Sequence, residues 1–236
     1  MNLILFETDE LERRVPLSDR RAVHLREVLG RELGGVFDAG VVDGRRGTGT
    51  VVGVHEDGLD VTFVWGEPAP LLDPITVIVG LPRPQTARKI LHEVTALGVE
   101  AIHFVSVEMG DPGYAQSKLW TTGEWRRHVM LGAEQSFNPR LPAVFFGQSL
   151  AAVLEALPVG CRVALDNYES ALSLGQTEIA LPLTLAVGPE RGWAAEERDL
   201  LRSEGFALSH MGQRVLRVET ACVAALAITR SRLDLI

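Results

Sequence analysis

The amino-acid sequence predicts an α/β protein with a mostly parallel sheet, preceded by a small β-barrel. After residue 70, continuous apolar strands alternate with helical segments, which is typical of a parallel sheet buried on both faces. Before residue 70, short strands with alternating apolar residues are joined by glycine turns. A proline-bearing connector at 66–70 separates the two patterns, so we expect domains at residues 1–70 and 71–236.

The first domain is expected to contain three strands and one short helix. The strands are predicted at about residues 36–42, 48–54 and 61–65, because apolar residues recur with a period of two between glycine turns. A partial apolar face predicts a short helix between Leu17 and Gly30. Strands this close in sequence indicate a closed or half-closed barrel, since closure removes exposed strand edges.

The second domain is expected to alternate strands with helices. Continuous apolar stretches predict buried strands, and apolar residues three and four apart predict helices. The expected strands are 75–79, 101–107, 161–165 and 183–187, and the expected helices are about 84–97, 124–135, 194–204 and 220–232. Gly98 follows the first helix, at the place where a glycine commonly ends one.

The composition excludes several classes of protein. No apolar run approaches the roughly 18 residues of a membrane span, and the first residues lack the basic segment of a signal peptide. Two cysteines, Cys161 and Cys222, cannot build a disulfide scaffold, so we expect a reducing cytoplasmic location. The six histidines show no metal-ligand spacing, so we expect no catalytic metal.

The charge balance bears on nucleic-acid binding. The chain has 31 acidic and 23 basic residues and a net charge of −8, whereas nucleic-acid-binding modules usually carry the opposite sign. All basic residues except Lys89 and Lys118 are arginine, whose planar guanidinium suits phosphates and base edges. A GC-rich genome produces the same bias, so both explanations stay open.

The strongest local motif lies at residues 185–193, where an apolar strand runs into a Gly-Pro turn before a helix with an acidic first turn. Gly188 and Gly192 allow backbone geometry and close ligand approach that other residues do not. Ligands of open α/β sheets bind at the carboxyl ends of the strands. The alternative is an ordinary strand–helix connector. Glycine motifs for dinucleotides and nucleoside triphosphates are absent.

A second motif covers residues 211–221, with a glycine turn, two arginines and the start of the last apolar helix. Arg217 lies between Leu216 and Val218, and a buried arginine is costly unless it is paired. Glu219 is the candidate partner for such a structural pair.

A third motif, Glu134-Gln135-Ser136, lies at the end of the helix expected at 124–135. Taken alone, Glu134 and Gln135 are interpreted as solvated helix-end residues, because charged and amide side chains are mostly exposed.

These motifs together resemble one family. They are Gly188-Pro189-Glu190-x-Gly192, then Leu216-Arg217-x-Glu219-Thr220-Ala221, preceded by Glu134-Gln135-Ser136 and Leu97-Gly98-Val99. In this order they resemble the RsmE family of SPOUT RNA methyltransferases. His24-Leu25-Arg26-x-Val28-Leu29 and the glycine-rich β segment after it are similar to that family's PUA-like RNA-binding barrel. The resemblance covers nearly the whole chain, and its C-terminal motif pair is the specific part.

The resemblance implies methylation of N3 of one uracil in 16S ribosomal RNA, free or in the small ribosomal subunit, with S-adenosyl-L-methionine as cofactor and no metal. It also implies a homodimer, a PUA-like barrel at 1–70 and a SPOUT domain at 71–236 whose pocket is formed by a trefoil knot. The residues expected to bind the cofactor are Leu165, Val187, Gly188, Pro189, Glu190, Gly192, Met211, Gly212, Val215, Leu216, Arg217 and Thr220.

The expected catalytic residues are Arg217, Arg191 and Glu190. Uracil N3 is a poor nucleophile while it carries its proton, so a base must remove the proton or cations must stabilise the developing charge. Arg217 or Arg191 is expected to supply the electrostatic part, and Glu190 to position a group or the loop. The expected RNA contacts are His24, Arg26, Arg83, Arg88, Lys89, Glu134, Gln135 and Arg140.

The chain departs from the family pattern at several positions on the substrate side. Arg191 replaces a usual glycine, Ala96 replaces a usual acidic residue, and Asn138 stands where an arginine is usual. Leu81-Pro82-Arg83-Pro84 replaces a Lys-Gly-x-Arg pattern. Two alternatives therefore stay open, namely another SPOUT enzyme acting on ribosomal or transfer RNA, and a non-catalytic RNA-binding or assembly protein.

Overall fold

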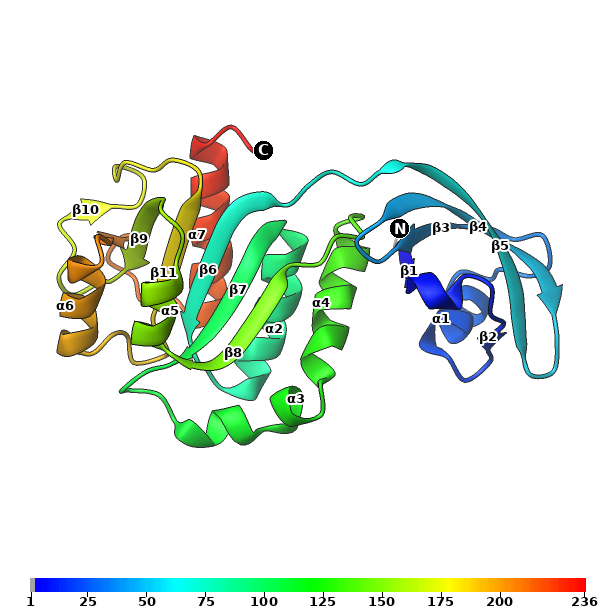
Figure 1. The fold of residues 1–236 in the computed structure, drawn as a ribbon, viewed down its shortest axis with the longest axis horizontal. Coiled ribbons are helices and arrows are strands. Elements are labelled where there is room, and N and C mark those ends of the chain that lie inside the picture. The colour runs from blue at the N-terminus through cyan, green and yellow to red at the C-terminus, as the bar shows by residue number, and fades with distance from the viewer. Residues whose placement is uncertain (1–2) are drawn as a thin grey trace. The chain divides into compact units, whose positions relative to one another are not determined.

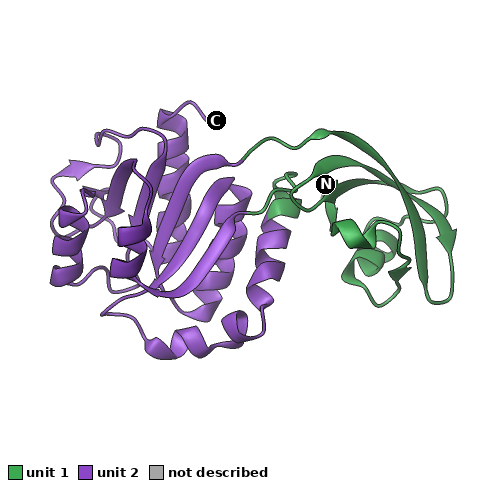
Figure 2. Ribbon diagram, in the orientation of Figure 1, with its two compact units in different colours: residues 1–71, 133–141 green, residues 72–132, 142–236 purple. Residues whose placement is uncertain are grey.

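The computed structural model describes residues 3–236 and separates into two compact units (Figures 1 and 2). Unit 1 comprises residues 1–71 and 133–141, and unit 2 comprises residues 72–132 and 142–236. The chain passes from one unit to the other beside the proline-bearing connector. Residues 133–141 belong to unit 1, whereas the sequence predicts them within the second domain.

Unit 1 is built on a five-stranded sheet in the order β1-β3-β4-β5-β2. The strands are β1 (Ile4–Phe6), β2 (Val15–Pro16), β3 (Val36–Val41), β4 (Arg45–Val54) and β5 (Gly58–Pro68). β1 runs parallel to β3, and the other neighbours are antiparallel. The three expected strands are confirmed as β3, β4 and β5. β1 and β2 were missed because each is too short to show a period.

Short helical turns cover part of this sheet. They are η1 (Thr8–Glu10), α1 (Arg20–Val23) and η2 (His24–Val28), the last a single π-helical turn. Phe6 is fully buried, its ring centroid 4.9 Å from that of Phe63, and the guanidinium carbon of Arg21 lies 4.7 Å from the Phe6 centroid. The Arg21 side chain therefore lies directly against the apolar core of unit 1.

The segment 133–141 is tied to unit 1 by polar contacts. Arg20 Nη2 donates to Glu134 Oε1 at 2.8 Å, and the Leu5 amide donates to the same oxygen at 3.3 Å. Arg140 Nε donates to the Ala69 carbonyl at 3.1 Å. Glu134 is buried, so its interpretation as a solvated helix-end residue was wrong. Its partner is the partly exposed Arg20, and nothing local in the sequence indicated that pairing.

Unit 2 is built on a seven-stranded sheet in the order β10-β12-β9-β11-β6-β7-β8, with every neighbouring pair parallel. The strands are β6 (Asp73–Gly80), β7 (Val99–Ser106), β8 (Ala143–Ser149), β9 (Cys161–Leu165), β10 (Leu172–Ser173), β11 (Leu183–Val187) and β12 (Ala207–His210). The four expected strands are confirmed as β6, β7, β9 and β11. All five residues of β11 are buried, as its continuous apolar sequence predicts.

Helices cover both faces of this sheet (Figure 1). They are α2 (Pro84–Ala96), η3 (Pro112–Gln116), α3 (Lys118–Thr121), α4 (Glu124–Gln135), α5 (Leu150–Ala156), α6 (Ala195–Ser203) and α7 (Val218–Arg232). α2 and α7 pack together on one face, and α5 and α6 share a core with the strands on the other. The expected helices are confirmed as α2, α4, α6 and α7, and no helix within residues 3–236 is long and apolar enough to cross a membrane.

The strand order brings several loops together at one edge of the sheet. β11 inserts between β9 and β6, and β12 adds to the far side of β9. The loops that leave β9, β11 and β12 therefore meet at one edge of the sheet. In open α/β folds this edge, at the carboxyl ends of the strands where the order reverses, is where ligands bind.

Cys222 provides a check on the packing of α7. Its side chain is fully buried, and burial raises the pKa of its thiol to about 12. Because the thiolate is the reactive form, we expect iodoacetamide at pH 8 to leave Cys222 unmodified in the folded protein while the partly exposed Cys161 reacts. Peptide mass spectrometry measures both, and equal labelling before and after unfolding in urea would contradict this packing.

Candidate functional site

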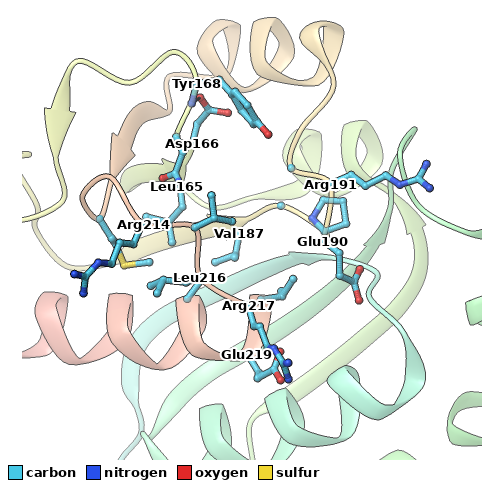
Figure 3. Close-up of a pocket in the computed structure, with 18 of the residues that line it drawn as sticks. Leu165, Asp166, Tyr168, Val187, Glu190, Arg191, Arg214, Leu216, Arg217 and Glu219 are labelled. Carbon is cyan, nitrogen blue, oxygen red and sulfur yellow. Dashed lines mark hydrogen bonds between the residues drawn. The ribbon is translucent and has the colours of Figure 1, made fainter.

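A cavity of about 810 Å³ opens at the carboxyl ends of β9 and β11 (Figure 3). Its walls come from the loops that follow β9, β11 and β12, with Arg83 and Thr86 contributed by the start of α2. Leu165, Val187 and Leu216 lie towards its centre. This volume falls within the range of small-molecule and cofactor sites, roughly 300–1,000 Å³.

The loop after β11 depends on its glycines. A Cβ at Gly188 would lie 3.1 Å from Gly192 Cα, and Gly192 has a positive φ of 74°. The Gly192 amide donates to the Pro189 carbonyl at 2.9 Å and closes the turn. Pro189 packs against Gly80, the last residue of β6, where a Cβ would lie 2.6 Å from the Pro189 ring. The loop is therefore a compact bend that leaves little room for a side chain at Gly80 or Gly188 and relies on the positive φ of Gly192.

The end of β9 is held by Trp193 and Asp166. The Trp193 indole donates to the Leu165 carbonyl at 3.1 Å. Asp166 is only 4% exposed, and its Oδ1 accepts from the amides of Tyr168 at 2.8 Å and Glu169 at 2.6 Å. Its other oxygen lies 3.6 Å from Arg198 Nη1. Asp166 lines the cavity and was missed from the sequence, although an acid directly after a buried strand was a signal for it.

Two carboxylates of the cavity are paired with cations. Glu190 Oε1 accepts from the Arg83 amide at 3.2 Å and lies 3.4 Å from Arg83 Nε. This contact is at the first turn of α2, where a negative charge is favourable. Lys89 Nζ donates to Glu219 Oε1 at 3.1 Å. Burial alone would raise the pKa of Glu219, but hydrogen bonds from its own amide and from Lys89 outweigh it and hold the pKa below its usual value.

Arg217 is not the buried, paired arginine that one interpretation of the sequence required. It is exposed, and Glu219 takes its hydrogen bond from Lys89 instead. Arg217 is near enough to contribute to the lowered pKa of Glu219, yet its guanidinium forms no hydrogen bond or salt bridge within residues 3–236. Its charge is therefore available to a ligand in the cavity.

The cavity brings together all but one of the residues expected at the cofactor. Those that line it are Leu165, Val187, Gly188, Pro189, Glu190, Gly192, Met211, Gly212, Val215, Leu216 and Arg217, together with Arg191 from the expected catalytic set. Thr220 is exposed on the first turn of α7 and is not among the lining residues. Sequence reasoning missed Asp166, Asn167 and Tyr168, which follow β9 and lie outside the motifs, whereas Gln213 and Arg214 belong to the motif at 211–221 without having been singled out.

The expected RNA contacts of unit 2 separate into different environments. Arg83 lines the cavity beside Glu190, and Lys89 is paired with Glu219. Arg88 Nε lies 2.8 Å from Glu124 Oε1, and this hydrogen bond, with a second from His128, lowers the pKa of Glu124 to about 2. Arg88 is thus engaged within unit 2.

Some of the expected RNA contacts of unit 1 are bound to other residues of the protein, and others are exposed. Glu134 and Arg140 hold the segment 133–141 in place and are engaged internally. Arg26 and Gln135 are exposed. His24 is half-buried, and its Nε2 has no hydrogen-bond partner within the described part of the chain.

The packing of Pro189 on Gly80 yields a testable consequence for ligand binding. In Gly80→Ala the new methyl group overlaps Pro189, so the loop after β11 must shift. Overpacking of this kind costs about 1–3 kcal/mol, and we expect calorimetry to show affinity for the cavity's ligand weakened by about tenfold or more. Gly175→Ala is the matched control, because its nearest neighbour would be 3.8 Å away. Equal affinities of both variants would contradict this account of the loop.

The protein has a parallel sheet, and glycine loops at the carboxyl edge of this sheet enclose a cavity that is partly apolar and partly charged. These features define an α/β protein that binds a nucleotide-like cofactor. A family model described as RNA methyltransferase domain matches residues 68–230. The chain is 31% identical over 239 residues to a ribosomal RNA small subunit methyltransferase E of Treponema pallidum, covering 97% of this chain and 90% of the relative. It belongs to the ribosomal RNA small subunit methyltransferase E family.

Two solved structures show the same fold over nearly the whole chain. A ribosomal RNA small subunit methyltransferase E from Neisseria gonorrhoeae, bound to S-adenosyl methionine, is 24% identical with a TM-score of 0.80, covering 99% of this chain and 98% of that one. A methyltransferase from Legionella pneumophila, in complex with the same compound, is 20% identical with a TM-score of 0.83, covering 98% and 97%. Within residues 3–236 no group of three or more His, Cys, Asp or Glu side chains could hold a metal ion.

Proposed function

We propose that this protein transfers a methyl group from S-adenosyl-L-methionine to N3 of one uracil in 16S ribosomal RNA. The observation that carries the proposal is the single cavity formed by the loop after β11 and the segment 211–219, two glycine-bearing motifs that are separate in the sequence. Membership of the family supports the reaction and the class of RNA.

The residues of the cavity fit this cofactor. Leu165, Val187 and Leu216 offer apolar contacts for an adenine ring, and the tight loops present main-chain groups to its edge and to the ribose. When bound, the cofactor supplies an activated methyl group that needs no metal.

The chain's own residues orient the RNA base and stabilise charge on it. Glu190 and Glu219 are each paired with a cation, so neither is a free general base, and Glu190 serves to hold the loop against the start of α2. Arg217 lies beside them, and its guanidinium, which forms no hydrogen bond or salt bridge within residues 3–236, would stabilise negative charge on the uracil oxygens as N3 loses its proton. Arg191 points away from the centre of the cavity in Figure 3, which favours Arg217 for this role.

The proposal extends to the whole chain. Unit 1 would be a PUA-like barrel that binds RNA through exposed residues such as Arg26 and Gln135, and unit 2 a SPOUT domain. A trefoil knot in unit 2 is supported by the insertion of β11 between β9 and β6 and by the return of α7 against α2. The enzyme would act as a homodimer on 16S ribosomal RNA or the small subunit in the cytoplasm.

Two measurements test this function. Calorimetry with S-adenosyl-L-methionine is expected to show binding at one site per chain, and absence of binding would leave only a non-catalytic RNA-binding protein. Mass mapping of 16S ribosomal RNA from a deletion strain is expected to show loss of one methyl group, on uracil N3, and its return with the intact gene. Loss of a different modification would assign the chain to another methylation reaction.

A further inference from the structure

Three exposed side chains stand at the edge of the cavity, on three different loops: Tyr168, Arg191 and Arg214 (Figure 3). Tyr168 is 75% exposed, and both arginines are exposed. The two arginines lie on opposite sides of the cavity in this view, and Tyr168 lies above its centre. We call these three residues the rim.

Tyr168 is exposed but held in place. Its amide donates to the buried carboxylate of Asp166 at 2.8 Å, which fixes the backbone directly after β9. The guanidinium carbon of Arg198 lies 5.7 Å from the Tyr168 ring centroid, and Arg198 Nε is itself bound to Glu169 at 2.8 Å. The ring is therefore supported by a fixed cation while most of its surface remains open to solvent. A positioned, open aromatic ring is a platform on which a nucleobase can stack.

The two rim arginines are free, in contrast to several other arginines of unit 2. Within residues 3–236, neither Arg191 nor Arg214 forms a hydrogen bond or ion pair, whereas Arg83, Arg198 and Arg202 of the same unit are bound to carboxylates. The chain carries 31 acidic residues, so an unpaired guanidinium is not explained by a shortage of partners. A guanidinium presents a fork of donors that matches a phosphate.

We propose that the rim binds the target nucleotide in an unstacked conformation, with the base against Tyr168 and the neighbouring phosphates on Arg191 and Arg214. N3 of a uracil lies on its pairing edge, so a methyl donor within a cavity reaches it only when the base has left its stack. Phosphate contacts on both sides of the base would fix its position without reading its identity. This inference rests on the proposed function and assigns the substrate side of the same site.

The stacking part is tested by Tyr168→Ala and Tyr168→Trp. With unmodified small ribosomal subunits as substrate, we expect Tyr168→Ala to raise the KM for RNA about tenfold or more, in line with the loss of one base–aromatic stack. Tyr168→Trp keeps a platform and should restore most of the affinity. Calorimetry should show unchanged binding of S-adenosyl-L-methionine in both variants. An unchanged KM, or a loss of cofactor affinity that matches the change in KM, would overturn the stacking role.

The phosphate part is tested by salt dependence. Log affinity falls as log salt concentration rises, and removing one phosphate contact should make this negative slope shallower by roughly 0.7–1. We expect this decrease in steepness in Arg191→Ala and in Arg214→Ala. Arg127→Ala is the matched control, because Arg127 is an exposed arginine of α4 outside the cavity. Unchanged slopes in both rim variants, or an equal decrease in the control, would refute the phosphate contacts.

The wild-type protein separates this inference from the proposed function. Failure of the wild type to bind the cofactor or to methylate RNA would refute the function itself. If the wild type does both and the rim variants match it in KM for RNA and in salt dependence, only the proposed role of the rim in RNA binding is refuted.

Discussion

Arg217→Ala is expected to lower kcat for methyl transfer by about 10²–10³-fold while the protein stays folded and binds its cofactor. The loss follows from removing one positioned charge from the developing negative charge, an effect of about 2.7–4 kcal/mol in comparable sites. Arg217 is exposed and makes no hydrogen bond or salt bridge within residues 3–236, so its removal should cost little stability. Single-turnover methylation of unmodified small ribosomal subunits measures the rate.

Two further variants make this prediction specific to the guanidinium. Arg217→Lys retains the charge but loses the planar fork, so an intermediate rate is expected. Arg191→Ala should change the KM for RNA more than kcat, since Arg191 points away from the centre of the cavity. A folded Arg217→Ala protein with a near-normal rate would remove Arg217 from the mechanism.

Arg21→Met is expected to destabilise unit 1 by up to about 3–5 kcal/mol, the cost of removing one partner of a fully buried ion pair, because the Glu10 and Asp19 carboxylates left behind are only partly exposed. The Arg21 side chain is 10% exposed, and its guanidinium nitrogens lie 2.6 Å from Glu10 and 2.7 Å from Asp19. Urea unfolding followed by circular dichroism measures the loss. The matched control is Arg13→Met, because the Arg13–Asp9 pair has both side chains 67% exposed and such pairs contribute about 0–1 kcal/mol. Similar losses in both variants would contradict the importance of burial.

The same ion pairs predict how the stability of unit 1 depends on pH. The hydrogen bond from Arg21 lowers the pKa of Glu10, and at Asp19 the contacts with Arg21 outweigh burial and also lower the pKa. Groups with a depressed pKa in the folded state stabilise it above their ordinary values of about 4, and this contribution is lost as the pH falls through the folded pKa. The unfolding free energy should therefore fall more steeply below pH 4 in the wild type than in Arg21→Met, and parallel curves would refute the assignment.

Much of the secondary structure and the location of the cavity follow from local sequence. β6, β9 and β11 are predominantly apolar stretches, and α2 has an apolar face, so each element carries its own signal. The glycine loop at 188–192 was also readable, because a positive φ at Gly192 is an intrinsic preference of that residue type. β1, β2 and β10 were missed because two or three residues show no period, and β8 and β12 were missed as well.

The partners of the charged side chains could not be read from the sequence. Glu134 is buried against Arg20 over a sequence separation of 114 residues, and Glu219 is bound to Lys89 over 130. No local pattern encodes such pairs, because they depend on which strands and helices become neighbours. The expected roles of Glu134, Arg88 and Lys89 in RNA binding were assigned as though these side chains were free.

The sequence by itself determined the kinds of element, their order and the two glycine bends that form the cavity, because propensity and turn geometry act over a few residues. Only the tertiary structure decided that Glu190 faces Arg83, that Arg217 has no partner among residues 3–236 and that the Tyr168 ring is exposed beside Asp166. These arrangements depend on the insertion of β11 between β9 and β6, a long-range pairing that no local signal specifies.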